Sequence, residues 1–196
     1  DFIIASGLHA LYLPVLRDCY NLKIYLDIDE GLRRHFKLKR DVLQRGHSVK
    51  QVLGSLEKRE PDSERFIRPQ SRHADLILSV QPIHPRMIGD LGNKHPLLLK
   101  LVVNTRNGFN ELSIHRVLVG VCGLRVDIVA GNDSADVQLT IEGEASAADI
   151  AMAAAILCPS VLEFLDITPK WQDGMLGLMQ LVTLSHISQA LTRRFI

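Results

Sequence analysis

Cysteine is scarce in this sequence, and the few cysteines form no recognisable pattern. Cys19, Cys122 and Cys158 are far apart and odd in number, which argues against the disulfide framework of a small secreted domain. Their spacing gives no zinc-binding motif either. Each lies beside apolar residues, so we expect buried free thiols and a reducing, cytoplasmic setting.

The chain also lacks a surplus of charge of either sign. It has 23 basic and 22 acidic residues, and its formal net charge is +1. A general nucleic-acid or membrane-surface binder carries an excess of Lys and Arg, so we expect neither nucleic acid nor a membrane as a partner. Any function that needs positive charge must then depend on a local cluster of basic residues.

Long apolar runs are missing as well. No basic segment precedes an apolar run as in a signal peptide. The apolar run at residues 175–191 contains Gln180, Ser185 and His186 and is too short and polar to span a bilayer comfortably. With 196 residues, 46% of them hydrophobic, the chain is expected to form one large globular domain or two small ones.

Short apolar runs and helix signals alternate in the first part of the sequence. Residues 1–5, 22–28 and 74–80 are apolar runs that predict buried strands. Strands that are apolar on both faces and separated by helices favour a parallel sheet. We therefore expect residues 1–82 to form part of an α/β core with a parallel sheet.

Two helices are expected between the second and third of these strands. The first, over residues 30–45, can be capped by Asp29. The second begins at a capping box of Ser48 and Gln51. We expect it to stop at Pro61, because proline disrupts the interior of a helix.

The second part of the sequence has a different pattern. Residues 83–96 contain prolines and glycines and predict a linker, followed by an α+β domain of unknown role over residues 97–196. Alternating arms around residues 131–134 predict a β-hairpin. A long helix is expected over residues 173–194, and its broad apolar face predicts either a core contact or a homo-oligomer interface.

The clearest functional signal is the basic stretch KLKRDVLQRGHS, residues 37–48. On a helix with about 100° between residues, five of its polar side chains fall within about 140° of one another: Lys37, Arg40, Asp41, Gln44 and Arg45. Arginine suits phosphate because its planar fork donates two parallel hydrogen bonds. The stretch therefore predicts a phosphate-binding helix, in which Asp41 either orients an arginine or contacts a metal ion.

The same spacing also permits an interpretation without function. Lys37 and Asp41 are four residues apart, so they could form an ion pair on a solvated helix face. Such a pair contributes only about 0.3–0.5 kcal/mol. Charge spacing alone leaves both interpretations open.

The stretch resembles a motif of the phosphoribulokinase and uridine kinase family of P-loop small-molecule kinases. That motif reads Lys, an aliphatic residue, any residue, Arg-Asp, three residues, Arg-Gly, any residue, Ser or Thr, any residue, Glu. The matching residues are Lys37, Leu38, Arg40, Asp41, Arg45, Gly46 and Ser48. SGLHALY (6–12), KIYLDIDEGLRR (23–34) and residues 59–82 resemble further family segments in the same order, so the resemblance covers residues 1–82.

The resemblance implies an ATP-dependent kinase that uses Mg²⁺ and transfers phosphate to a hydroxyl group of a sugar phosphate or nucleoside. Arg40 and Asp41 would be catalytic residues of its lid. Lys37 and Arg45 would bind the phosphates of ATP and substrate. His9 would face the substrate pocket. No metal ligand is assigned to this chain.

The chain departs from the family at three points. Lys50 replaces the last Glu of the motif, and Ser6 replaces an acid near the metal; a hydroxyl cannot supply a carboxylate's charge to Mg²⁺. The sequence also contains no G-x-x-x-x-G-K-[ST] loop for the phosphates. Because the family places that loop before the matched segments, we expect this chain to be the C-terminal portion of such a kinase, inactive alone. The alternative is a non-catalytic, degenerate kinase-like module for ligand sensing or oligomer assembly.

Overall fold

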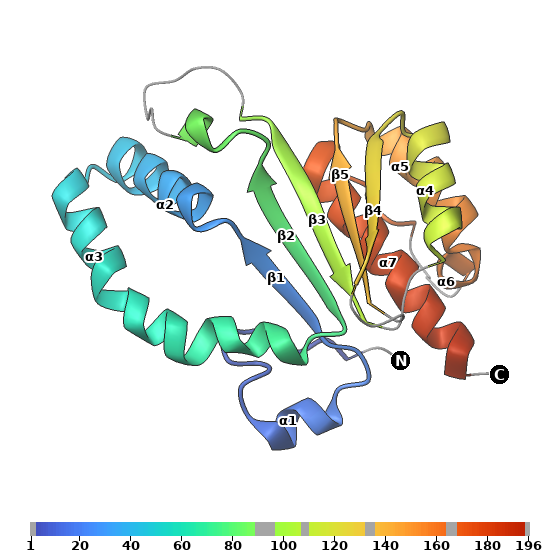
Figure 1. The fold of residues 1–196 in the computed structure, drawn as a ribbon, viewed down its shortest axis with the longest axis horizontal. Helices are drawn as coiled ribbons and strands as arrows, with labels where there is room; N and C mark the ends of the chain where they lie inside the picture. The colour runs from blue at the N-terminus through green and yellow to red at the C-terminus, as the bar shows by residue number, and fades with distance from the viewer. Residues whose placement is uncertain (1–2, 89–96, 107–109, 132–135, 164–167, 195–196) are drawn as a thin grey trace.

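The computed structural model describes residues 3–88, 97–106, 110–131, 136–163 and 168–194. Five strands form one sheet in the order β1-β2-β3-β5-β4 (Figure 1). Their bounds are β1 Ile24–Ile28, β2 Leu76–Pro82, β3 Leu99–Thr105, β4 Arg125–Ala130 and β5 Val137–Glu142. β1 and β2 are parallel, as expected for the first part of the sequence, and the remaining neighbours are antiparallel.

Seven α-helices accompany the sheet in the described residues: α1 Pro14–Cys19, α2 Glu30–Leu38, α3 Val49–Asp62, α4 Glu111–Gly120, α5 Ala147–Leu157, α6 Pro159–Glu163 and α7 Gly174–Arg194. Four shorter segments are helical with other spacings: the π-helices η1 Lys39–Gln44 and η2 Ser63–Ile67, and the 3₁₀ helices η3 Arg68–His73 and η4 Pro85–Ile88. In Figure 1, α4 to α7 gather around β3–β5, whereas α2 and α3 project beyond β1 at the other end of the sheet. We call residues 30–67, from α2 through η2, the arm.

The core lies between one face of the sheet and the helices of the second part of the chain. Its sheet side is a set of almost fully buried apolar residues on β2, β3 and β5: Leu76, Leu78, Leu101, Val103, Leu139 and Ile141. The helices α4, α5 and α7 supply the opposite side, which includes Ile114, Ile150, Leu178 and Leu181. Burying one such side chain stabilises the fold by roughly 1.5–3 kcal/mol. The middle of α7 is therefore a core contact of its own chain.

Several local signals from the sequence are confirmed. The Asp29 side chain accepts a hydrogen bond from the Leu32 N–H at 2.9 Å and so caps α2. Ser48 and Gln51 form the expected capping box of α3. β4 and β5 pair as the two arms of the expected hairpin, although its turn at 132–135 lies outside the described residues.

Two predictions about backbone structure were wrong. Residues 3–5 form no strand, and the side chains of Ile3 and Ile4 are 97% and 90% exposed. A strand needs a neighbour for its backbone hydrogen bonds, and none of the described residues pairs with this segment. Pro61 does not stop α3 either: the helix includes it and continues into the π-helix η2. Proline has no N–H for the i→i−4 hydrogen bond, yet the helical chain continues beyond it with the i→i+5 spacing of η2.

The cysteine prediction was correct for two of the three residues. Cys122 and Cys158 are buried, but Cys19 is exposed. Cys19 ends α1, a short surface helix without a buried residue, and its Sγ donates to the Val15 carbonyl at 3.2 Å. Val15 and Leu16, the apolar residues that precede it on α1, are themselves exposed and belong to no core.

The expected boundary at residues 83–96 lies partly outside the described residues, because 89–96 are not among them. The strands that flank it, β2 and β3, pair with each other from Leu76–Thr105 to Pro82–Leu99. The division into two domains stays a prediction. In the part of the chain that the structure describes, no helix has both the length and the apolar character needed to cross a membrane.

Candidate functional site

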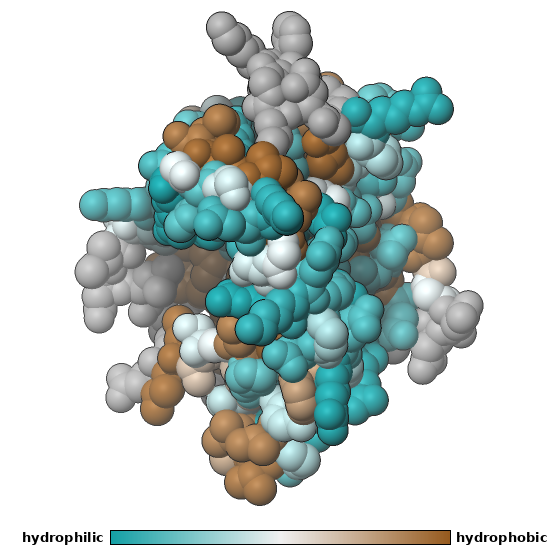
Figure 2. Space-filling model, turned by 90° about the vertical axis from the view of Figure 1, so that its left-hand side faces the viewer, coloured by the Kyte–Doolittle hydropathy of each residue, from teal (hydrophilic) through white to brown (hydrophobic). Residues whose placement is uncertain are grey.

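A surface pocket lies where the arm meets the end of β1. Its volume is about 440 Å³, and its lining is Ile28, Arg33, Phe36, Lys37, Lys39, Arg40 and Gln44. Most of these side chains come from α2 and η1, and four of them are cations. Figure 2 shows that the side of the molecule formed by the arm is mostly hydrophilic, with hydrophobic side chains in its upper part and at its lower end. The pocket can therefore hold a multiply charged anion.

Helical spacing brings the cations of the pocket together. Arg33 and Lys37 are four residues apart on α2, so they project from the same face of the helix, and Arg40 follows on η1 and lines the same pocket. Asp29 fixes where α2 begins and thereby which face carries them. The sequence thus places a row of positive charge along the side of the arm that borders β1.

Asp41 organises the far end of this row. Its Oδ1 accepts hydrogen bonds from Arg40 Nε at 2.8 Å and from Arg45 Nη1 at 3.1 Å, and its Oδ2 accepts one from Arg40 Nη2 at 3.2 Å. The Asp41 side chain is 10% exposed, whereas those of Arg40 and Arg45 are 50% and 56% exposed. A shielded carboxylate therefore holds two guanidinium groups that still reach solvent.

The charges of this end of the site are stable near neutral pH. The hydrogen bonds from Arg40, aided by the nearby charges of Arg40, Arg45 and Lys37, hold the pKa of Asp41 below its ordinary value of 3.8. The same contact raises the pKa of Arg40. Because the pKa of Asp41 is depressed, its hold on the two arginines is present above pH 3.8 and is lost only as the pH falls through the lower folded value.

Lys37 is in a different electrostatic position from the arginines. Burial, followed by the positive charge of Arg59, lowers its pKa from the ordinary value of 10.5. A lowered pKa means that the protein disfavours the charged ammonium in the absence of an anion. An anion in the pocket would relieve this cost, so Lys37 is suited to bind one.

The sequence-predicted residues occupy different places around the pocket. Lys37 and Arg40 line it. Asp41 and Arg45 lie outside the lining. Asp41 contacts Arg40 directly, and Arg45 is connected to Arg40 through Asp41. His9 is exposed in the turn 7–12 and is not among the lining residues. The ion pairs of Asp41 in the described part of the chain are with arginines, and the Lys37–Asp41 pair is not one of them.

The turn that carries His9 is held against the base of the arm by one buried side chain. Gln70 accepts a hydrogen bond from the Leu11 N–H at 2.9 Å and donates to the carbonyls of Leu8 and Phe66 at 2.8 and 2.7 Å. The Tyr12 ring meets the Phe66 and His9 rings edge to face, with centroids 5.7 and 5.9 Å apart. His9 is thus tied to the end of the arm rather than to its pocket.

Sequence reasoning missed part of the pocket. Arg33 and Phe36 line it but were not predicted, and Lys39 lines it as a cation of the basic stretch to which no role was assigned. Arg33 carried a usable signal, because it lies one helical turn before Lys37 on the same face. Ile28 carried none, since a strand residue reaches the pocket only through the tertiary fold.

Comparison with known proteins shows which family the segment that contains this site is similar to. Residues 1–85 match the family described as the Phosphoribulokinase / Uridine kinase family. The chain is 36% identical over 92 residues to a phosphoribulokinase of Synechocystis sp., which covers 47% of this chain and 27% of that protein. It is 38% identical over 80 residues to a chloroplastic phosphoribulokinase of Spinacia oleracea, covering 41% and 20% of the two proteins.

A uridine kinase of Staphylococcus epidermidis is similar as well, with 40% identity over 79 residues, covering 40% of this chain and 38% of that protein. The chain thus spans between 20% and 38% of the length of these three relatives. The arm and its pocket lie wholly within the matched segment. The resemblance inferred from KLKRDVLQRGHS is confirmed: residues 1–85 match the phosphoribulokinase and uridine kinase family, and relatives of both kinds are similar to this chain.

Proposed function

We propose that the chain provides the phosphate-binding arm of an ATP-dependent kinase whose acceptor is a hydroxyl group of a sugar phosphate or nucleoside. The observation that carries this proposal is the pocket lined by Arg33, Lys37, Lys39 and Arg40, within a segment of kinase sequence. Names of relatives support both acceptor classes, since phosphoribulokinases and a uridine kinase are both similar to this chain.

In this proposal the arm acts through charge and position. ATP supplies the phosphoryl group, and Lys37 and Arg40 hold its phosphate oxygens. A phosphoryl group in transfer carries negative charge that fixed cations stabilise without having to reorganise. Asp41 orients the guanidinium groups of Arg40 and Arg45, so that they are already ordered when the phosphate arrives.

Mg²⁺ is the cofactor that the family implies besides ATP. Among the described residues, no group of three or more His, Cys, Asp and Glu side chains is arranged to hold a metal ion. The carboxylate of Asp41 is already bonded to two arginines, which fits the orienting role better than metal contact. The residues of this chain thus fit a polyphosphate, and we derive no step of the reaction through a metal ion.

The test is acceptor-dependent ADP release by the intact protein, with ribulose 5-phosphate and uridine as acceptors. We expect Arg40→Gln and Arg45→Gln to lower turnover by about 100-fold or more, since each removes a cation from the transferring phosphate. Arg34→Gln is the matched control, because Arg34 is exposed on α2 and does not line the pocket. Turnover that is the same in all three variants would refute the proposal.

The departures of the sequence favour a second candidate function. Ser6 and Lys50 replace acids of the family pattern, so the arm could bind phosphate in a module without catalytic activity. Such a module would bind polyphosphate through the same pocket. It would release no ADP with any acceptor, even as the intact protein, so the assay above decides between the two candidates.

A further inference from the structure

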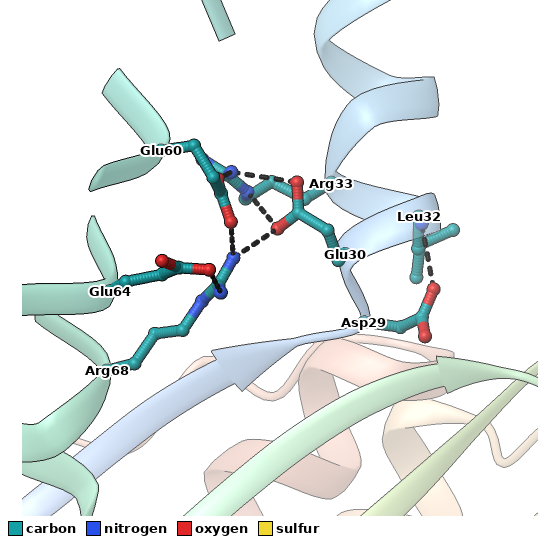
Figure 3. A network of polar contacts seen from close by, with 7 residues as sticks. All are labelled: Asp29, Glu30, Leu32, Arg33, Glu60, Glu64 and Arg68. Atoms are coloured by element: carbon teal, nitrogen blue, oxygen red, sulfur yellow. Dashed lines mark hydrogen bonds and ion pairs between the residues drawn. The ribbon is translucent and has the colours of Figure 1, made fainter. Parts of the chain in front are cut away.

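A second cluster of charged side chains lies beside the pocket, at the base of the arm. We call it the clasp, and it consists of Glu30, Arg33, Glu60, Glu64 and Arg68 (Figure 3). Glu30 and Arg33 belong to the start of α2, Glu60 to the last turn of α3, and the other two to η2 and η3. The clasp therefore joins the beginning of the arm to its end.

Two carboxylates of the clasp are shared between both arginines. Arg33 donates from Nε and Nη2 to the two oxygens of Glu30, both at 2.8 Å, and from Nη2 to Glu60 Oε2 at 3.1 Å. Arg68 Nη2 donates to Glu30 Oε2 at 3.3 Å and to Glu60 Oε1. Glu64 contacts Arg68, 3.6 Å from its Nη1.

Arg33 is the member of the clasp that also lines the pocket. Its bonds to the carboxylates use Nε and Nη2, so the Nη1 donors lie outside the clasp. The side chain is 35% exposed, which leaves it accessible to a ligand. Arg33 also continues the row of Lys37 and Arg40 by one helical turn.

We propose that Arg33 is a further phosphate-binding residue of the arm pocket, and that Glu30 and Glu60 are positioning residues that hold its guanidinium in place. The ligand class is a polyphosphate, as in a nucleoside triphosphate. The inference rests on the proposed function and deepens it, because it adds a ligand contact that the family motif at residues 37–48 does not include.

The physical reason for the clasp is preorganisation. A long, flexible side chain must be ordered when it binds a ligand, and this ordering opposes binding. Two carboxylates that already fix Arg33 remove much of that cost. A bidentate contact, as with Glu30, fixes the plane of the guanidinium as well as its place. Arg68 bonds to Glu30 and Glu60 as well and so connects the two ends of the arm, but it does not line the pocket.

The first test is the affinity of the 196-residue chain for inorganic tripolyphosphate, by titration calorimetry at low ionic strength. Arg33→Gln should weaken binding about tenfold, the effect of losing one charge-assisted hydrogen bond. Arg33→Lys should restore only part of the affinity, because lysine lacks the planar fork. The control Arg34→Gln loses the same charge from the same helix and should stay within about twofold of wild type.

The second test separates positioning from support of the fold. Glu60→Gln removes the negative charge that Arg33 and Arg68 share and leaves one acceptor oxygen for the two of them, whereas Glu64→Gln alters a contact of Arg68 only. We expect the Nε–H resonance of Arg33, in spectra of ¹⁵N-arginine-labelled protein, to shift on addition of tripolyphosphate in wild type and in Glu64→Gln. In Glu60→Gln it should broaden, and the affinity should fall about threefold or more as the guanidinium loses order.

The outcomes distinguish this inference from the proposed function. If wild type binds tripolyphosphate but Arg33→Gln binds as well as Arg34→Gln, Arg33 is not a ligand contact, and the kinase proposal stands on Lys37 and Arg40. Equal affinities of Glu60→Gln and Glu64→Gln would refute the positioning role. Absence of binding in wild type would overturn both the inference and the phosphate-binding arm.

Discussion

Replacing Gln70 by leucine should release the turn that carries His9. Gln70 is 4% exposed, and its amide makes three hydrogen bonds to the backbone, with Leu11, Leu8 and Phe66. Leucine has a similar size but can make none of them. At about 1 kcal/mol for each bond, the free energy of unfolding should fall by about 3 kcal/mol.

Part of this loss should appear locally. The Leu11 N–H donates to Gln70 in a buried contact, so it should exchange slowly with solvent in wild type and rapidly in the variant. Urea unfolding followed by circular dichroism gives the free energy, and amide hydrogen exchange reports on Leu11. Gln70→Glu keeps the acceptor for Leu11 but loses both donors, so it should retain more protection at Leu11 than leucine does.

Gln138→Leu is the matched control. Gln138 is an exposed residue of β5 that donates one hydrogen bond, to Asn104 Oδ1 at 2.8 Å. Its replacement should change the free energy of unfolding by less than about 0.5 kcal/mol. If Gln70→Leu is as mild as this control, and the Leu11 amide stays protected, then Gln70 does not hold the turn.

Three further predictions concern charge, thiols and the core. Because the pKa of Lys37 lies below 10.5, tripolyphosphate affinity should begin to fall before that pH is reached, and Lys37→Arg should lose less affinity because arginine keeps its proton to about pH 12 or above; equal losses would contradict this. A maleimide at neutral pH should label Cys19 alone in the native protein, since burial raises the pKa of the other two thiols, and mass spectrometry would show any second label. Leu139→Ala should cost about 2–5 kcal/mol of unfolding free energy, because Leu139 is fully buried, whereas Leu112→Ala, at a position that is 68% exposed, should cost less than about 0.5 kcal/mol.

Features whose signals lie within a few residues of one another were predictable from the sequence. The caps by Asp29 and Ser48 are of this kind, because donor and acceptor are three residues apart. The same holds for the kinase motif at residues 37–48, which contains three of the four cations that line the pocket. Such patterns are local, so no knowledge of the tertiary fold was needed to find them.

Features that depend on tertiary partners were not predictable. Residues 3–5 are apolar enough for a strand, but a strand exists only beside another strand. The hydrogen bond from Arg33 to Glu60 joins residues that are 27 positions apart in the sequence. No local pattern indicates such a contact.

The pairing of β2 with β3 has a consequence for how the protein folds as it is synthesised. β2 lies within the segment matched to the kinase family and β3 lies after it, yet the two strands pair along their whole lengths. Leu76 and Leu78 are buried partly by residues of that later part of the chain. We therefore expect the nascent family segment to remain incompletely folded on the ribosome until β3 has emerged, with the edge of β2 exposed to other chains or to chaperones during that interval.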